Sequence, residues 1–292
     1  MLTTESQNPA SLNLDQMSAL DIVKTMNAED AGVAQSVAQV LPEVAQAVDA
    51  ITERMQRGGR LIYIGAGTSG RLGVLDAVEC VPTFNVPPTL VLGIIAGGEK
   101  AIVRSVEGAE DDADGGRHDL AAVELCDLDS VVGIAASGVT PYVLGALEYA
   151  QALGALTVGV ACNVPSAVVS RAQIGIGVSV GPEVLTGSTR LKSGTAQKMV
   201  LNMLSTGVMV RLGKVYGNLM VDVQITNDKL SARARRIVAQ VAKISEERAA
   251  SLLHLASGNA KTAIVMSVKG VTADVARKLL DQQSGKLREI IG

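Results

Sequence analysis

Aromatic residues and metal-binding side chains are scarce in this sequence. Aromatics make up 2% of the 292 residues, with no Trp and one Phe, whereas hydrophobic residues together make up 48%. The core must therefore consist of Val, Leu, Ile and Ala, a composition typical of buried parallel strands. The two His and the widely spaced Cys80, Cys126 and Cys162 form neither a local metal-ligand cluster nor a disulfide framework. We expect reduced thiols and a chemistry that needs no metal and no cofactor.

Long hydrophobic runs are also missing. No run of about 18 apolar residues appears, and the N-terminus `MLTTESQNPAS` lacks the charged and then hydrophobic pattern of a signal peptide. We therefore expect a cytoplasmic protein without membrane contact. The net charge is −3, yet residues 231–292 contain 11 Lys or Arg against 5 Asp or Glu. Because these basic residues are scattered along amphipathic helices without interleaved aromatics, we interpret them as a solvated face and expect no nucleic-acid partner.

The hydrophobic pattern changes twice along the chain. Residues 17–58 have apolar positions at three- and four-residue steps, which predicts helices. Five short, β-branched apolar runs then alternate with helix-length segments, which predicts an α/β fold with a doubly wound, parallel, five-stranded sheet. The remainder is helical in pattern. We predict an N-terminal arm with helices packing on the main domain (1–58), a sheet domain (59–230) and a small helical C-terminal module (231–292).

The five predicted strands each end on Gly, Ser or Asn. They lie in the runs `RLIYIGAG`, `TLVLGIIAGG`, `SVVGIAASG`, `LTVGVACN` and `IGIGVSVGPE`. Ligands of doubly wound sheets bind beyond the carboxyl ends of the strands, and these small closing residues lie there. A functional site is therefore expected in the turns after the strands.

The first turn, `IGAGTSG`, has the Gly65-x-Gly67-x-x-Gly70 spacing of a dinucleotide fingerprint. Such a site needs an acidic residue about 20 positions further on, at the end of the second strand. The second predicted strand instead ends in the residues Ala-Gly-Gly at 96–98. The fingerprint therefore fails, and the turn is interpreted either as a site for a phosphate group or as a tight turn whose Ser or Thr caps a helix.

Hydroxyl-rich turns follow two further strands, which favours the phosphate interpretation. In `GIAASGVTPY` the hydroxyls precede a helix that begins near Pro141, and `GPEVLTGSTRLKSGTAQK` adds basic residues. Converging turns of this kind can surround a phosphate monoester, with hydroxyl donors for its oxygens and a helix dipole opposing its charge. The predicted binding residues are Gly67, Thr68, Ser69, Ser137, Gly138, Thr140, Ser188 and Lys192.

Five segments together resemble the N-acetylmuramic acid 6-phosphate etherase family of the SIS (sugar isomerase) superfamily. They are `IGAGTSGRLGVLDAVECVPTF`, `AIVRSVEGAEDD`, `GIAASGVTPYV`, `GPEVLTGSTRLKSGTAQKMVLNM` and `VDVQITNDKL`, and the resemblance covers nearly the whole chain. It implies a sugar-phosphate substrate and cleavage of its lactyl ether, in the recycling of cell-wall sugars. It also implies a homodimer with sites near the subunit interface.

The resemblance assigns roles to carboxylates. An elimination needs one carboxylate as base and one carboxylic acid as proton donor. Glu79 in `DAVEC` matches the family's proton donor, and its spacing from Leu72 and Leu75 predicts that it shares their inward-facing stripe. Glu110 in `VEGAEDD` matches the second catalytic residue, expected to remove the carbon 2 proton. Glu183 is a third candidate, either as a base or as a group that binds a sugar hydroxyl, because related sugar isomerases have a glutamate at this position.

Two other functions are compatible with the same fold. The sequence also resembles glucokinase regulatory protein, a sugar-phosphate sensor without catalysis. That protein has two SIS domains, and after residue 230 this chain lacks a second set of strands and hydroxyl-rich turns. An isomerase acting on an amino-sugar phosphate would use similar enolisation chemistry and stays open as an alternative.

Overall fold

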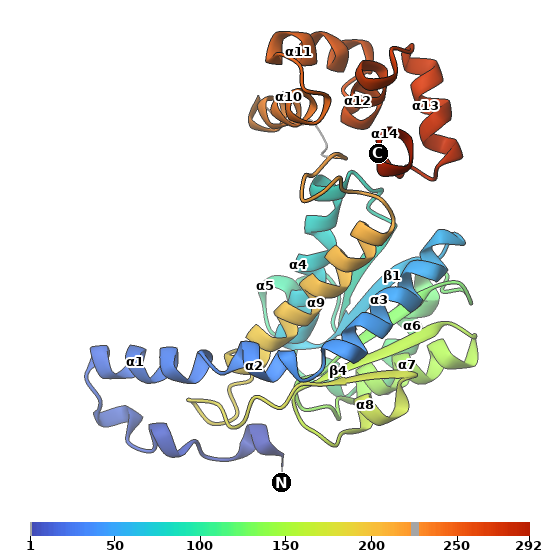
Figure 1. Cartoon of the computed structure of the whole chain (residues 1–292). Coiled ribbons are helices and arrows are strands. Elements are labelled where there is room, and N and C mark those ends of the chain that lie inside the picture. The colour runs from blue at the N-terminus through green and yellow to red at the C-terminus, as the bar shows by residue number, and fades with distance from the viewer. Residues whose placement is uncertain (1, 223–227) are drawn as a thin grey trace. The chain divides into compact units, whose positions relative to one another are not determined.

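The computed structural model describes residues 2–222 and 228–292 (Figure 1). Five residues of the motif `VDVQITNDKL`, 223–227, lie outside the described residues. The chain divides into two compact units, Met1–Val78 with Pro88–Ser205, and Glu79–Pro87 with Thr206–Gly292. The first unit contains the sheet, and the second contains the C-terminal helices together with the end of a long helix, α9. Within the described ranges, each helix is too short or too polar to span a membrane.

Five parallel strands form the centre of the first unit, in the order β2-β1-β3-β4-β5. Every residue of β1, β3 and β4 is buried, as expected for apolar runs covered on both faces. The predicted doubly wound sheet is therefore confirmed. The strand order reverses between β1 and β3, which is where such folds open a ligand crevice. The bounds are β1 Leu61–Gly65, β2 Val91–Ile95, β3 Ser130–Ile134, β4 Leu156–Ala161 and β5 Ile174–Gly177.

Alternating side chains of β1 are buried on opposite faces of the sheet. Ile62 and Ile64 belong to an apolar cluster with the inner side of α7. Tyr63 points the other way, and its hydroxyl donates to Asp76 Oδ2 on α4 (2.8 Å). The sheet is thus enclosed by α6 (Ala113–Ala122), α7 (Pro141–Ala152) and α8 (Ala167–Arg171) on one face, and by α3 (Leu41–Gln56), α4 (Gly67–Phe84) and α9 (Lys192–Arg211) on the other.

An N-terminal arm precedes these helices and folds back beside α1 (Figure 1). Asn8 Nδ2 donates to Glu29 Oε2 on α1 (2.7 Å), and Ser11 Oγ donates to the Val184 carbonyl (2.7 Å). The arm is therefore held against the turn that follows β5. Its elements are the 3₁₀ turns Thr3–Glu5, Pro9–Ser11 and Leu14–Gln16, followed by α1 (Ala19–Asp30) and α2 (Val33–Ala38).

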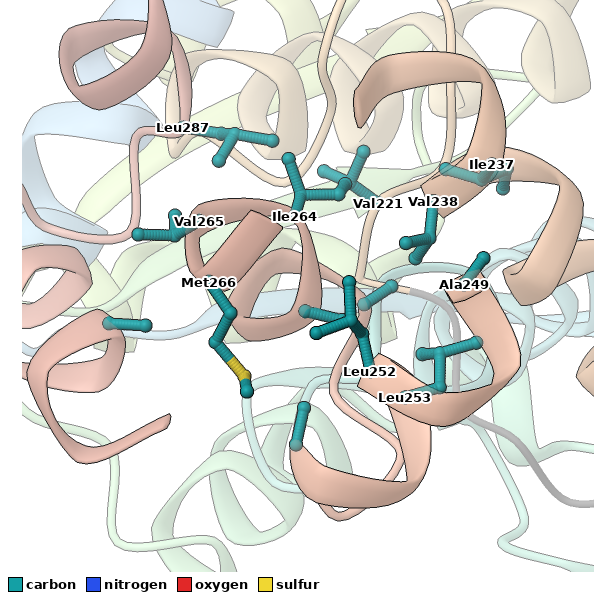
Figure 2. Packing of buried hydrophobic residues seen from close by; sticks show 14 of the residues in the cluster. Val221, Ile237, Val238, Ala249, Leu252, Leu253, Ile264, Val265, Met266 and Leu287 are labelled. Atoms are coloured by element: carbon teal, nitrogen blue, oxygen red, sulfur yellow. The ribbon is translucent and has the colours of Figure 1, made fainter. Parts of the chain in front are cut away.

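The second unit is helical, as its sequence pattern predicts. Figure 2 shows its core, in which Val238, Leu252 and Ile264 from three helices pack together with other aliphatic side chains. Ser245 and Asn259 cap α11 and α12 by accepting hydrogen bonds from backbone amides. The helices are α10 (Asp228–Ala242), α11 (Glu246–Leu255), α12 (Ala260–Lys269), α13 (Ala273–Gln282) and α14 (Arg288–Ile291).

Candidate active site

The turn between β1 and α4 presents backbone amides that donate to none of the described residues. Gly67 has a left-handed φ of +54° and open space where a Cβ would lie. A Cβ on Gly70 would lie 2.6 Å from the Gly65 carbonyl oxygen, so glycine allows the helix to approach the strand closely. The first intrahelical bond runs from Gly70 N to Ala66 O, which leaves the amides before Gly70 for an anion.

Two predicted phosphate ligands lie beside the first turn of α9. The Ser69 hydroxyl is buried and donates to Gln197 Oε1 (2.9 Å). Thr68 Cγ2 is 3.6 Å from the position that a Cβ on Gly194 would take. Gln197 is 1% exposed, and its Nε2 has no partner among the described residues. The N-terminal turns of α4 and α9 therefore meet, and Gln197 positions the Ser69 hydroxyl.

The turn between β3 and α7 carries two hydroxyls, and Ser137 Oγ accepts a hydrogen bond from the Val139 amide within the turn (3.4 Å). Thr140 precedes α7 but makes no side-chain cap, and its Oγ1 is 3.4 Å from Ser137 Oγ. Gly138 has a φ of +73°, and a Cβ there would lie 2.3 Å from Ser166 Cβ. The turn is thus fixed by close packing, while its hydroxyls remain available to a ligand at the carboxyl edge of the sheet.

Glu183 and Lys192 are engaged inside the protein. Glu183 is 0% exposed and accepts hydrogen bonds from the backbone amides of Lys192 and Ser193 (2.9 Å each) and from Ser193 Oγ (2.8 Å). Its carboxylate therefore caps α9. The Lys192 ammonium is also buried and pairs with Glu29 Oε2 (2.6 Å); this hydrogen bond holds the pKa of Glu29 below its ordinary value.

Ser188 lies between these two residues in the same turn. It is half-buried, and its backbone amide donates to the Leu185 carbonyl (2.9 Å). The neighbouring Gly187 amide donates to the Thr4 carbonyl of the arm (3.1 Å). The arm thus fixes the backbone of the turn that presents the Ser188 hydroxyl.

A cavity of about 350 Å³ lies next to the β1–α4 turn. It brings together Gly67 from that turn and Glu110 from the 3₁₀ turn Ala109–Asp111. Arg71 and Glu107 also line it. Of the residues predicted from sequence, Gly67 and Glu110 share this cavity, while the hydroxyls lie in the turns described above. Across the described ranges, no three His, Cys, Asp or Glu side chains gather as a metal site would require.

Glu79 lies in the part of α4 that belongs to the second unit. The prediction of an inward-facing stripe for this helix is wrong for the single chain. Leu75 is 53% exposed and Val78 is 61% exposed, and Glu79 itself is exposed. The period of the apolar residues correctly marks one face of the helix, but the other described residues leave that face exposed at Leu75 and Val78.

Sequence reasoning did not single out Asn163 as a site residue, although it closes the run `LTVGVACN` two residues after the end of β4. Its Nδ2 donates to Thr4 Oγ1 (3.0 Å) and to the Ala136 carbonyl (3.1 Å), and its Oδ1 accepts from the Thr4 amide (3.3 Å). It therefore joins the N-terminal arm to the β3–α7 turn. A polar residue two positions after a buried strand was the available signal, since strand ends carry ligands and their supports in this architecture.

Known proteins resemble this chain over almost its full length. A relative from Actinobacillus pleuropneumoniae serotype 5b, named N-acetylmuramic acid 6-phosphate etherase, is 55% identical over 290 residues, covering 99% of this chain and 95% of the relative. The chain belongs to the N-acetylmuramic acid 6-phosphate etherase family. A Streptomyces coelicolor member of the family is 56% identical over 287 residues, covering 98% of this chain and 92% of that relative.

Domain profiles and a solved structure agree with the fold. The glucokinase regulatory protein N-terminal SIS domain matches residues 43–151, and the C-terminal lid domain of the same protein matches residues 217–263. A phosphoheptose isomerase from Francisella tularensis superposes with a TM-score of 0.53 at 20% identity, covering 66% of this chain and all of that one. The SIS fold expected from sequence is therefore confirmed.

Proposed function

We propose that this chain cleaves the D-lactyl ether of N-acetylmuramic acid 6-phosphate. The products are N-acetylglucosamine 6-phosphate and D-lactate, which places the enzyme in amino-sugar recycling, and a phosphorylated sugar substrate favours the cytoplasm as its location. The observation that carries the proposal is the cavity in which Glu110 accompanies Gly67, next to the first backbone amides of α4, in a chain 55% identical to a named etherase.

The chemistry follows from the acidity of the sugar. An alkoxide is a poor leaving group, so direct hydrolysis of an ether is slow. In the open-chain form, the hydrogen on carbon 2 is acidic because it lies next to the aldehyde. A base takes this proton, the bond between carbon 3 and the lactyl oxygen breaks, and an acid gives that oxygen its proton. Water then adds to the double bond, with its hydroxyl on carbon 3 and a proton on carbon 2.

We assign the base to Glu110 and the acid to Glu79. Glu110 is exposed and lines the cavity, so its carboxyl group is accessible to a substrate that enters there. Glu79 needs a less polar setting to stay protonated. Its helix exposes Leu75 and Val78, and a second subunit covering this apolar surface would provide that setting.

The phosphate group is bound by the turns at the reversal of strand order. The amides of Gly67, Thr68 and Ser69 and the dipole of α4 attract the anion. Ser137 and Thr140 supply hydroxyls from the β3–α7 turn, with Ser188 as a further donor. Gly138 keeps that turn close to Ser166. In this arrangement Glu183 and Lys192 hold the β5–α9 turn in place and do not contact substrate.

The central experiment is incubation of the purified chain with N-acetylmuramic acid 6-phosphate, followed by enzymatic detection of D-lactate. Stoichiometric release of D-lactate and N-acetylglucosamine 6-phosphate is expected. Binding of the sugar phosphate without release of D-lactate would instead identify a sensor, the alternative suggested by the match to glucokinase regulatory protein domains. A ketose product would identify an isomerase.

A labelling experiment tests the order of bond breaking and formation. In heavy-oxygen water, the new hydroxyl at carbon 3 comes from solvent, so the sugar product gains the label there and D-lactate keeps the original ether oxygen. Mass spectrometry of both products measures this. An unlabelled carbon 3 would exclude elimination followed by addition of water.

Substitutions distinguish the proposed roles of Glu79 and Glu110 from those of neighbouring acidic residues. Glu110→Gln and Glu79→Gln should each lower kcat by about a hundredfold or more, with substrate binding changed by less than about tenfold, because each group acts mainly in the transition state. Glu107→Gln is the matched control, since Glu107 is exposed and lines the same cavity three residues earlier. Equal losses in Glu107→Gln and Glu110→Gln would contradict the assignment of a specific base.

The active form is proposed to be a homodimer. In α1 none of the 12 residues is buried, and Leu20 and Val23 are 59% and 57% exposed. A helix with an uncovered apolar face is expected to pack on another chain. Sedimentation velocity should give the mass of two chains, and Leu20→Lys with Val23→Lys should shift it toward one. A wild-type chain that sediments as a monomer at micromolar concentration would contradict the proposal.

A further inference from the structure

Arg71 is held at the wall of the cavity by one edge of its guanidinium group. It follows Gly67 by four residues on α4, so both lie on the same side of the helix. Its Nε donates to the carbonyl oxygen of Ile102 (2.9 Å), which belongs to α5 (Lys100–Val103). This bond joins α4 to the segment that leads to Glu110 and fixes the direction of the Arg71 side chain.

The remaining donors of Arg71 have no partner within the described ranges. The Nε group is occupied by Ile102, whereas the two Nη groups neither form an ion pair nor donate to any described residue. Arg71 is half-buried, and among the described residues that line the cavity it is the only basic side chain. The acidic side chains of Glu107 and Glu110 line the same cavity. A fixed guanidinium with both Nη groups available fits a planar, two-oxygen anion such as a carboxylate.

Two anionic groups of the proposed substrate could bind Arg71. The phosphate group is accounted for by the helix amides and by the β3–α7 turn, at the reversal between β1 and β3. Arg71 instead bonds to Ile102 of α5, and the cavity that it lines is also lined by Ala96 after β2 and by Ala101 of α5, whereas β2 and β3 lie on opposite sides of β1. The second anionic group is the carboxylate of the lactyl ether, which is attached one carbon away from the oxygen that must leave.

We propose that Arg71 binds the lactyl carboxylate through its two Nη groups and so selects ethers that carry a carboxylate. This inference rests on the proposed function, because it names the part of that substrate which Arg71 holds. The contact holds the lactyl group in the cavity that Glu110 lines, and the Arg71 charge offsets the repulsion between the lactyl carboxylate and the carboxylates of Glu107 and Glu110. After cleavage, the carboxylate departs with D-lactate, and N-acetylglucosamine 6-phosphate has no group that contacts Arg71.

The test compares two ligands on one variant. Arg71→Met should lower kcat/KM for N-acetylmuramic acid 6-phosphate by about 10- to 100-fold, the range for loss of a hydrogen-bonded charge pair. The Kd of N-acetylglucosamine 6-phosphate, measured by calorimetry, should change by less than about threefold. Arg71→Lys keeps the charge without the planar pair of donors and should lie between wild type and Arg71→Met. Arg104→Met is the control, because Arg104 is exposed in the same segment but does not line the cavity.

A neutral substrate analogue separates recognition from support of the fold. If Arg71 binds the carboxylate, wild type and Arg71→Met should cleave the lactamide ether at similar, low rates. A structural role through Ile102 alone would slow the acid and the amide equally and weaken binding of both sugar phosphates, which would overturn the inference. If wild type releases no D-lactate, the proposed function fails. The inference is then judged by whether Arg71→Met still weakens binding of the lactyl compound more than that of N-acetylglucosamine 6-phosphate.

Discussion

Replacement of Glu183 by Gln tests whether this glutamate supports the site or acts in it. The Glu183 carboxylate is fully buried, and its Oε2 accepts from the Lys192 amide, while Oε1 accepts from the amide and the hydroxyl of Ser193. Gln can keep an oxygen toward Ser193. It then directs an NH₂ group at the Lys192 amide, so that two donors face each other and the start of α9 loses its negative charge.

The magnitude follows from these contacts. Losing one charge-assisted hydrogen bond costs about 1.5–3 kcal/mol, and losing a carboxylate at a helix N-terminus costs a further ~0.3–2 kcal/mol. A total of about 2–5 kcal/mol is expected for the Glu183→Gln variant, which corresponds to a fall in Tm of roughly 4–20 °C. Below its Tm, the variant should keep at least about a tenth of the wild-type kcat, because the carboxylate does not contact substrate.

Thermal unfolding followed by circular dichroism measures the stability, and D-lactate release measures kcat. Glu148→Gln is the matched control. The side chain of Glu148 is 55% exposed and forms a surface ion pair with Arg171, so the change should cost less than about 1 kcal/mol. The reasoning is refuted if Glu183→Gln unfolds within 1–2 °C (roughly, on the same scale) of wild type while kcat falls by about a hundredfold. That result would make Glu183 a group that acts on substrate.

Three further predictions concern glycine positions and pH. Gly70→Ala places a Cβ 2.6 Å from the Gly65 carbonyl oxygen and should lower the free energy of unfolding in urea by about 2 kcal/mol or more. Gly67→Ala has open space for its Cβ, so it should lower that free energy by about 1 kcal/mol because of its positive φ and should chiefly weaken phosphate binding. Similar stabilities for the two variants would contradict the packing argument. Burial disfavours ionisation of Asp129, but hydrogen bonds from Arg60 and two backbone amides outweigh it and lower the Asp129 pKa. The stability from the Arg60–Asp129 pair is therefore present above the unfolded pKa of Asp129 and is lost as the pH falls through the folded pKa. Asp129→Asn should lower the free energy of unfolding by about 2–3 kcal/mol near pH 7 and by progressively less toward acid. A loss of stability that does not depend on pH would refute the pairing. Burial raises the pKa of Asp76 despite hydrogen bonds from Tyr63 and Asn202, so the stability that comes from its protonated form is lost as the pH rises through the folded pKa. As the pH rises from about 4 to about 7, the Asp76→Asn variant should therefore gain stability relative to wild type. The opposite trend in guanidinium unfolding would contradict this prediction.

The local sequence pattern was sufficient to predict the helices and strands and the turns in which the candidate site lies. Short β-branched runs that alternate with helical segments can bury their apolar residues only as covered parallel strands, and all five runs are strands. The small residues after β1 and β3 lie in the turns that lead into α4 and α7, where the first backbone amides of each helix are. The failed dinucleotide fingerprint is likewise a local observation, since no acidic residue follows β2 in residues 96–98.

Pairings between distant segments depend on the tertiary structure. Glu29 and Lys192 are 163 positions apart, and Thr4 and Asn163 are 159 apart. No spacing rule relates such residues, because their contact depends on how the arm returns to the sheet. The same holds for Arg71, whose direction is fixed by the carbonyl of Ile102.

The sequence by itself determined the sheet, the family and the turns in which a phosphate can bind, because period, capping and close glycine packing act over a few residues. The tertiary structure decided which polar groups are used internally. Glu183 caps α9 and Lys192 pairs with Glu29, because a buried charge must find partners wherever the fold brings them. It also decided that the apolar stripe of α4 is exposed at Leu75 and Val78 among the residues that the structure describes: hydrophobic spacing defines a face, and only the surrounding structure supplies what covers it.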